Sequence, residues 1–405
     1  MITQNELALR HGRCRELVKL HLPDACGILI FSRINIYYLS GTVTNGVLWL
    51  PATGNPVLFC RKGAERARNE SPVADILEFR NFADISPALD SHGHRLSKKI
   101  AVEMNGISWA LSRSLRKHLH GHEFVSADRV LSMTRAVKTR FELEKMRKAG
   151  AAHARCLERL LPEKISAGMN EFEISSAILR IFMSEGHIGP LRMSGLGEDI
   201  FLGHTSVGDN ANMPGMFNGP VGLKGVHPSA PCMGSRETVW NEKEILTVDN
   251  GFNVDGYQTD KTMIYWSGRR RDIPDKAAAA HDFCLEIQQR LAERLKPGAI
   301  PEEIWNECME RVSKSRWKEG FMGVGPNRVG FVGHGIGLAI DEWPVIASGF
   351  REPLEAGMTI ALEPKIGIPG TGMVGIENTF EITDRGAESI TGNAFDITCV
   401  ASCAA

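Results

Sequence analysis

The sequence lacks an excess of charge of either sign, and it lacks a long apolar run. Its 47 lysines and arginines nearly balance its 48 aspartates and glutamates. Such a chain has no strong electrostatic attraction to nucleic acid or to an anionic membrane, so we expect neither as a partner. No apolar stretch reaches the roughly 18 residues that would span a bilayer, and residues 1–6 lack the basic and then apolar pattern of a signal peptide. These absences predict a cytoplasmic protein.

Paired cysteine spacings are also missing. The nine cysteines form an odd number and are scattered along the chain. A secreted disulfide framework uses an even number of cysteines at regular spacings, so this pattern instead suits free thiols in a reducing compartment. Cysteine usage therefore agrees with the expected cytoplasmic location.

A chain of 405 residues is longer than a domain with one ordinary hydrophobic core, so we expect two domains. Residues 1–136 alternate between helical and strand patterns and predict a mixed α/β domain. Residues 137–405 open with Thr139 and Glu142, which have the spacing of a capping box at the start of a long helix. Residues 186–235 are rich in glycine and proline and predict loops that can line a pocket.

The stretch from Asp249 to Asp260 predicts a hairpin with two acidic side chains on one face. Asp255-Gly256 is a strong signal for a two-residue turn, and this turn would place Asp249 opposite Thr262. Because side chains alternate along a strand, Asp249 and Asp260 then share a face as diagonal neighbours, roughly 7–8 Å apart. On an apolar surface two such carboxylates need a cation between them, and a metal is the natural one. Taken alone, the pair is equally consistent with a solvated strand face.

Three further residues favour a metal site. His334 lies between glycines that allow a close approach of the backbone, Glu363 closes an apolar run, and Glu377 lies in a strand that would otherwise bury a charge. Each has another interpretation: a satisfied core histidine, or carboxylates that end a strand or pair with a basic side chain. All five residues together fit one site better. Four carboxylates and one imidazole suit Mn, Co, Fe or Zn better than a structural thiolate zinc.

The two glutamates also predict a turn. Their even separation lets Glu363 and Glu377 lie opposite each other in a hairpin only if the loop between them has an odd number of residues. We therefore expect Pro369-Gly370-Thr371, or a bulge beside it, to form the turn.

The order Asp, Asp, His, Glu, Glu, with the histidine in Gly-His-Gly, resembles the pita-bread metallopeptidases, namely prolidase, aminopeptidase P and methionine aminopeptidase. The segments Asn35-Ile36-Tyr37-Tyr38-Leu39-Ser40-Gly41 and Arg135-Ala136-Val137-Lys138 resemble the creatinase-type N-terminal domain of prolidase and aminopeptidase P, which favours the two-domain members. The resemblance implies an α/β (α+β) fold, with a creatinase-like domain over residues 1–136 and a pita-bread catalytic domain over residues 137–405. It also implies a homodimer.

The resemblance further implies a role for each ligand. Asp249 would bind one of two divalent ions, His334 and Glu363 the other, and Asp260 and Glu377 would bridge them. A water between two such ions is acidified enough to act as hydroxide. Glu363 would pass the proton to the leaving amine. The implied reaction is hydrolysis of an amide bond near a peptide N-terminus.

Two positions depart from the family pattern. Gly215 and Asp341 stand where prolidase and aminopeptidase P carry histidines thought to orient substrate, and this leaves prolyl specificity open. His204 is close enough in sequence to substitute for one of them, or it is an ordinary loop histidine.

Asp341 raises a question of charge. A carboxylate near the metal ligands needs a positive group to offset it, and the candidates are Arg192, a metal or the substrate. If the substrate supplies the charge, it carries an amine or quaternary cation that Tyr257 or Trp343 could contact through the ring face.

The sequence therefore predicts a dinuclear metal-dependent hydrolase, foremost an Xaa-Pro dipeptidase or aminopeptidase acting on small peptides. The first alternative is a non-peptidase enzyme of the same fold, a lyase or hydrolase acting on a small cationic molecule. The second is a metal-free binding protein of the same fold.

Overall fold

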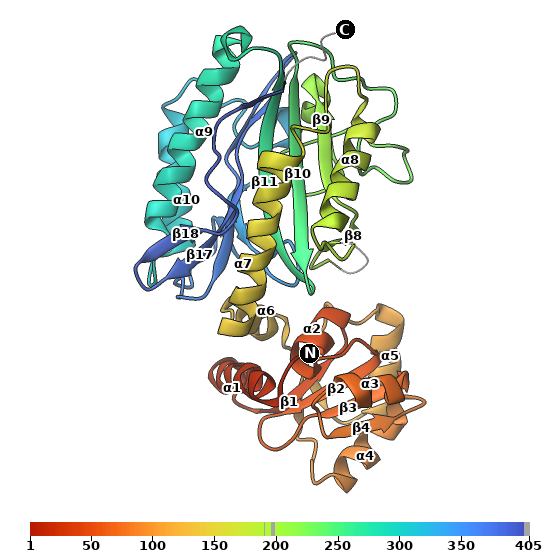
Figure 1. Ribbon diagram of the computed structural model, residues 1–405. Coiled ribbons are helices and arrows are strands. Elements are labelled where there is room, and N and C mark those ends of the chain that lie inside the picture. The colour runs from red at the N-terminus through yellow and green to blue at the C-terminus, as the bar shows by residue number, and fades with distance from the viewer. Residues whose placement is uncertain (190, 196–198, 401–405) are drawn as a thin grey trace. The chain divides into compact units, whose positions relative to one another are not determined.

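The computed structural model describes residues 1–189, 191–195 and 199–400. The chain divides into two compact units, Met1–Arg135 and Ala136–Ala405. The boundary that we expected from the sequence follows residue 136, one position further along. In Figure 1 the first unit is coloured red to orange, and the second runs from yellow to blue.

The first unit alternates helices and strands. Its helices are α1 (Gln4–His21), α2 (Arg33–Ser40), α3 (Ala64–Glu70), α4 (Ile85–Ser91), α5 (Trp109–His118) and α6 (Asp128–Ala136), and its strands are β1 (Ala25–Ile30), β2 (Asn45–Pro51), β3 (Val57–Lys62), β4 (Asp75–Glu78), β5 (Lys99–Val102) and β6 (Glu123–Ser126). The strands form one sheet in the order β4-β3-β2-β1-β5-β6, in which β1 pairs antiparallel with β2 and parallel with β5. Apolar side chains such as Trp49, Phe59 and Ile100 fill its core. The mixed α/β prediction is confirmed.

The second unit contains two sheets. Its helices are α7 (Arg140–Arg155), α8 (Glu171–Ser184), α9 (Asp275–Arg294) and α10 (Pro301–Ser313), and its strands are β7 (Leu191–Arg192), β8 (Asp199–Ile200), β9 (Gly203–Val207), β10 (Ile245–Val254), β11 (Tyr257–Ser267), β12 (Phe331–Gly335), β13 (Glu342–Ala347), β14 (Thr359–Leu362), β15 (Lys365–Ile368), β16 (Gly372–Gly375), β17 (Asn378–Thr383), β18 (Gly386–Ser389) and β19 (Thr398–Val400). The sheets run β19-β11-β10-β9 and β13-β12-β14-β17-β18, and β15-β16 and β7-β8 are two-stranded ribbons.

Helix α7 begins where the sequence indicates, and the helices of the second unit pack on its sheets and ribbons. The Thr139 hydroxyl accepts from the Glu142 N–H and the Glu142 carboxylate accepts from the Thr139 N–H, which confirms the capping box at α7. The core beside β10 and β11 contains Phe182, Trp240 and Phe252, and α7 and α8 lie beside these strands (Figure 1). Helix α9 packs beside β15 and β16, and α10 packs beside β13. Among the described residues, no helix is long and apolar enough to cross a membrane.

The central hairpin has the predicted register. Asp255 and Gly256 form the turn between β10 and β11 with φ of 54° and 89°, the left-handed values that a two-residue turn of this kind requires. Asp249 lies opposite Thr262, and Asp260 lies opposite Gly251. The two aspartates therefore share one face, as predicted.

The second register prediction is also confirmed. Pro369, Gly370 and Thr371 form a three-residue loop between β15 and β16. The pairing of β14 with β17 continues the same register, so Glu363 and Glu377 lie opposite each other just beyond the ends of these strands.

Two histidines are buried in the aromatic core between α7, α8 and β10. The His153 ring stacks on Phe252 with centroids 5.7 Å apart, and the His187 ring lies 5.2 Å from the same residue. His187 Nδ1 accepts from the Asn253 N–H at 3.1 Å, as a neutral ring can. Burial lowers the pKa of His187 to about 4 and lowers the pKa of His153 well below its ordinary value.

These pKa shifts predict that the protein loses stability in mild acid. The unfolded chain takes up protons on histidine below its ordinary pKa of about 6.5, whereas folded His187 stays neutral down to about pH 4. Stability that is present above pH 6.5 is therefore lost as the pH falls toward 4, by roughly 1–3 kcal/mol for one such group. The measurement is urea unfolding between pH 7 and 4.5, and His187→Gln, which keeps an acceptor but does not titrate, should show a shallower decline. Parallel pH profiles for the two proteins would contradict this account.

Candidate metal centre

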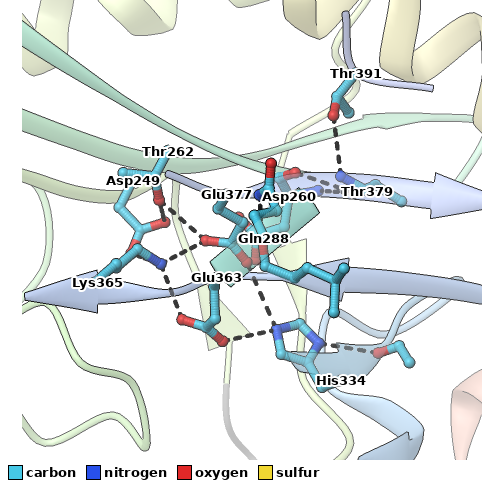
Figure 2. A network of polar contacts seen from close by, with 12 residues as sticks. Asp249, Asp260, Thr262, Gln288, His334, Glu363, Lys365, Glu377, Thr379 and Thr391 are labelled. Atoms are coloured by element: carbon cyan, nitrogen blue, oxygen red, sulfur yellow. Dashed lines mark hydrogen bonds and ion pairs between the residues drawn. The ribbon is translucent and has the colours of Figure 1, made fainter. Parts of the chain in front are cut away.

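Five side chains of the metal-ligand type come together where the two sheets of the second unit meet. Asp249 and Asp260 come from β10 and β11, His334 from β12, Glu363 directly follows β14, and Glu377 directly precedes β17. The sheets are joined at this point, since the Thr262 N–H donates to the Glu377 carbonyl at 3.2 Å and the Asp260 N–H donates to the Thr379 hydroxyl at 2.9 Å. Figure 2 shows the five side chains directed toward one another.

His334 is oriented to present a ring nitrogen to the carboxylates. Its Nδ1 lies 3.0 Å from the Gly335 carbonyl, so Nδ1 carries a proton and donates. Its Nε2 lies 3.4 Å from Glu363 Oε1 and 3.8 Å from Glu377 Oε1. Burial lowers the pKa of His334, but the hydrogen bond and charge of Glu363 outweigh burial and raise the pKa to about 9. A cation, either a proton or a metal, is thus favoured between this ring and the carboxylates.

Lys365 is the residue of this centre that sequence reasoning missed. Its Nζ lies 2.7 Å from Glu377 Oε2, 2.9 Å from Glu363 Oε2 and 3.6 Å from Asp249 Oδ2, and its side chain is 0% exposed. Burial lowers the pKa of Lys365, but the three carboxylates raise it well above its usual value. A signal was present in the sequence, because Lys365 follows Glu363 by two positions and shares its face in an extended strand.

The negative charges of the four carboxylates are offset to different degrees by neighbouring groups. Burial raises the pKa of Asp249 and of Glu363. Lys365, together with His204 and Thr262 at Asp249 and with His334 at Glu363, outweighs burial and holds both pKa values below their usual range. Burial and the Asp249 carboxylate raise the pKa of Asp260 to about 8, and burial together with Asp260 raises the pKa of Glu377 well above its usual range. The side of the centre that holds Asp260 therefore needs a further positive charge.

The donor set on that side fits a divalent metal ion. Asp260, His334 and Glu377 each bring one ligand atom to within 4.8 Å of the others. Glu377 Oε1 is buried and has no hydrogen-bond partner among the described residues, so it is available to an ion. Oxygen and imidazole ligands of this kind suit first-row transition ions.

A cavity of about 320 Å³ opens onto these residues, and it contains two of the predicted substrate-binding residues. His204 on β9 lies opposite Asp249, is 7% exposed, and its Nε2 has no hydrogen-bond partner within the described part of the chain. Asp341 accepts from the Ser194 N–H at 2.6 Å and from the Ser194 hydroxyl at 2.8 Å. Among the described residues no ion pair joins Arg192 to Asp341, so the donors to this carboxylate are the neutral groups of Ser194.

Tyr257, which we expected to bind substrate, does not line this cavity. It is 1% exposed and is absent from the residues that line the cavity. The register explains why: Tyr257 lies three positions from Asp260 on the regular strand β11, so its side chain points to the opposite face of the sheet. Gly215 is exposed. Phe217, two residues further on, lines the cavity and packs edge-on against His204, with ring centroids 5.5 Å apart.

Comparison with known proteins agrees with this geometry. The sequence-family model for metallopeptidase family M24 matches residues 144–384. The sequence-family model for the creatinase/prolidase N-terminal domain matches residues 11–137. The chain belongs to metallopeptidase family M24. It is 25% identical to the Xaa-Pro dipeptidase of Pyrococcus furiosus, over 94% of this chain and 97% of that protein.

Solved structures of low identity share the fold. The Xaa-Pro dipeptidase from Bacillus anthracis superposes with a TM-score of 0.78 at 20% identity, covering 97% of this chain and 99% of that one. The X-Pro aminopeptidase from Thermotoga maritima superposes with a TM-score of 0.76 at 20% identity, covering 96% and 99%. The pita-bread fold expected from the sequence is thereby confirmed.

Gly335, next to His334, packs closely against strand β13. A Cβ on Gly335 would lie 2.4 Å from the Trp343 carbonyl oxygen, so Gly335→Ala must separate β12 from β13 and shift His334. We expect a loss of roughly 1–3 kcal/mol in the free energy of unfolding and weaker Mn²⁺ binding, measured by denaturation and by calorimetric titration. Gly330→Ala, just before the same strand, meets nothing within 4 Å and is the control. Equal Mn²⁺ affinity in all three proteins would show that His334 is not a ligand.

Proposed function

We propose that this protein is a metal-dependent hydrolase that cleaves an amide bond near the N-terminus of a small peptide, with Xaa-Pro peptides as its substrate class. The main observation behind the proposal is that Asp260, His334 and Glu377 line one cavity and can bind a metal ion together. Glu363 lies beside them in the same cavity. Relatives named as Xaa-Pro dipeptidase and X-Pro aminopeptidase support the substrate class. The proposal includes Mn, Co, Fe or Zn as the metal, a cytoplasmic location taken from the sequence, and a homodimer taken from the resemblance.

A bound divalent ion would supply Lewis-acid chemistry at the reacting carbonyl and would lower the pKa of a water. The chain itself supplies the proton transfer. Glu363 Oε2 is held by Lys365 at 2.9 Å, and Oε1 faces His334 Nε2 at 3.4 Å. Oε1 would take a proton from water and deliver it to the leaving amine.

The proposal is tested with protein stripped by a chelator, reloaded with Mn²⁺, Co²⁺ or Zn²⁺, and assayed against dipeptides with and without proline. We expect turnover only after reloading, and a loss of kcat of about 100-fold or more in Glu363→Gln, because general acid–base catalysis contributes on that scale. Glu319→Gln, a change of an 83% exposed side chain, is the control. Full turnover by the stripped protein would contradict a metal-dependent function, and a folded protein that binds no metal would favour the metal-free binding protein.

A second candidate function is supported by Asp341. This carboxylate lines the cavity, and its hydrogen bonds come from the neutral groups of Ser194, so a cationic substrate could offset its charge. The candidate is a lyase or hydrolase that acts on a small molecule carrying an amine or a quaternary ammonium group.

Asp341 variants separate the two candidates. If a cationic substrate pairs with Asp341, then Asp341→Asn raises KM for it about tenfold, the scale of one charge contact worth about 1.4 kcal/mol, and leaves KM for a neutral analogue unchanged. If the peptidase role applies, Asp341→His should increase cleavage of prolyl dipeptides. Steady-state kinetics on both substrates gives the answer, and variants identical to wild type in every assay would mean that Asp341 only holds Ser194.

A further inference from the structure

We propose that the ammonium group of Lys365 takes the place of one of the two metal ions expected at this centre, so that the centre binds a single divalent ion. The inference rests on the metal-dependent function proposed above and specifies the composition of its site. It departs from the two ions that the family resemblance implies.

The two oxygens of each glutamate face different partners. Glu363 Oε2 and Glu377 Oε2 point to Lys365 Nζ at 2.9 Å and 2.7 Å, and Asp249 Oδ2 lies 3.6 Å from the same nitrogen. Glu363 Oε1 and Glu377 Oε1 instead face His334 Nε2 at 3.4 Å and 3.8 Å. Glu377, which the resemblance makes a bridging ligand, would divide its two oxygens between two ions in this way. Here a lysine occupies one of the two positions (Figure 2).

Lys365 contacts two carboxylates that an ion bound by Asp249 would need. Such an ion would need Asp249 together with an oxygen of Glu377, and these are the atoms that Nζ already contacts. The Thr262 hydroxyl, 2.8 Å from Asp249 Oδ1 and 3.0 Å from Glu377 Oε2, holds the two carboxylates in this arrangement. A protonated amine has no lone pair for a metal and repels one, so the ion and the ammonium cannot share the position.

The surrounding backbone is shaped for the lysine. Gly375 lies opposite Lys365 in the ribbon β15-β16, with φ of 143°, and a Cβ there would lie 2.6 Å from Lys365 Cα and 3.1 Å from Lys365 Cγ. On the outer side, Ile366 and Val374 of the same ribbon pack in the apolar core with Cys284 and Ile287 of α9. A lysine displaced from the carboxylates would lose its partners in a buried place, which is costly.

The charges are consistent with one ion. Four ionised carboxylates and one ammonium leave three negative charges, and one divalent ion at Asp260, His334 and Glu377 reduces these to one. The amine of a bound peptide could offset that remainder. Two divalent ions would leave an excess of positive charge directly beside an ammonium, which opposes binding of the second ion.

The test counts metal ions in the folded protein. Wild type, Lys365→Ala and Lys365→Arg are purified in excess Mn²⁺, passed through a desalting column and analysed by mass spectrometry for Mn per chain, and electron paramagnetic resonance shows whether the ions are isolated or exchange-coupled. We expect about one isolated Mn²⁺ per chain in wild type and in Lys365→Arg, which keeps the charge. We expect about two coupled ions in Lys365→Ala, which removes both the charge and the bulk.

Two exchange-coupled ions in wild type would overturn the inference while leaving the proposed function intact, and so would a folded Lys365→Ala that still binds one. No bound metal in wild type would overturn the proposed function itself. If Lys365→Ala fails to fold, the count and the spectrum of wild type decide the question alone.

Discussion

The mutual repulsion of four closely placed carboxylates, two of them buried, is the constraint on which the second unit depends. Asp249, Asp260, Glu363 and Glu377 lie at the junction of its two sheets, where the backbone of Thr262 reaches that of Glu377. Such a cluster is tolerated only with compensating positive charge and hydrogen-bond donors. Lys365 and the Thr262 hydroxyl provide them on one side. His334 lies on the other side with Asp260, and the proposed chemistry is concentrated there.

The fold makes this concentration of charge possible by fixing the register of several strands at once. A two-residue turn places Asp249 and Asp260 on one face, and a three-residue turn places Glu363 opposite Glu377. A slip of one residue in either hairpin would turn a carboxylate into the apolar cores beside α7 or α9. The apolar packing behind each sheet therefore serves the site by excluding alternative registers.

The sequence predicts those parts of the site that follow from local rules. Both turns, both registers and the capping box at α7 could be inferred because turn length and side-chain alternation are properties of short segments. Tyr257 was predicted from its aromatic ring and not from this rule, although its odd separation from Asp260 already excludes a shared face. Lys365 was missed because a metal-ligand pattern consists of carboxylates and histidine, and a lysine is not a metal ligand in such a pattern.

The contacts of Asp341 could not have been predicted in this way. Its partner Ser194 lies in the segment rich in glycine and proline, far away in sequence, and no periodicity relates the two residues. The unpartnered Nε2 of His204 is likewise a product of tertiary packing, since it depends on Phe217 and on the strand opposite. Features of this kind determine the shape of the cavity, and hence the substrate, more than the metal ligands do.

The most direct measurement of the central claim is anomalous diffraction from crystals of the wild-type protein soaked with Mn²⁺. We expect one anomalous peak per chain, bound by Asp260, His334 and Glu377, with Lys365 Nζ still between Glu363 and Glu377. Two peaks with the lysine displaced, or a soaked crystal with no peak at these residues, would contradict it.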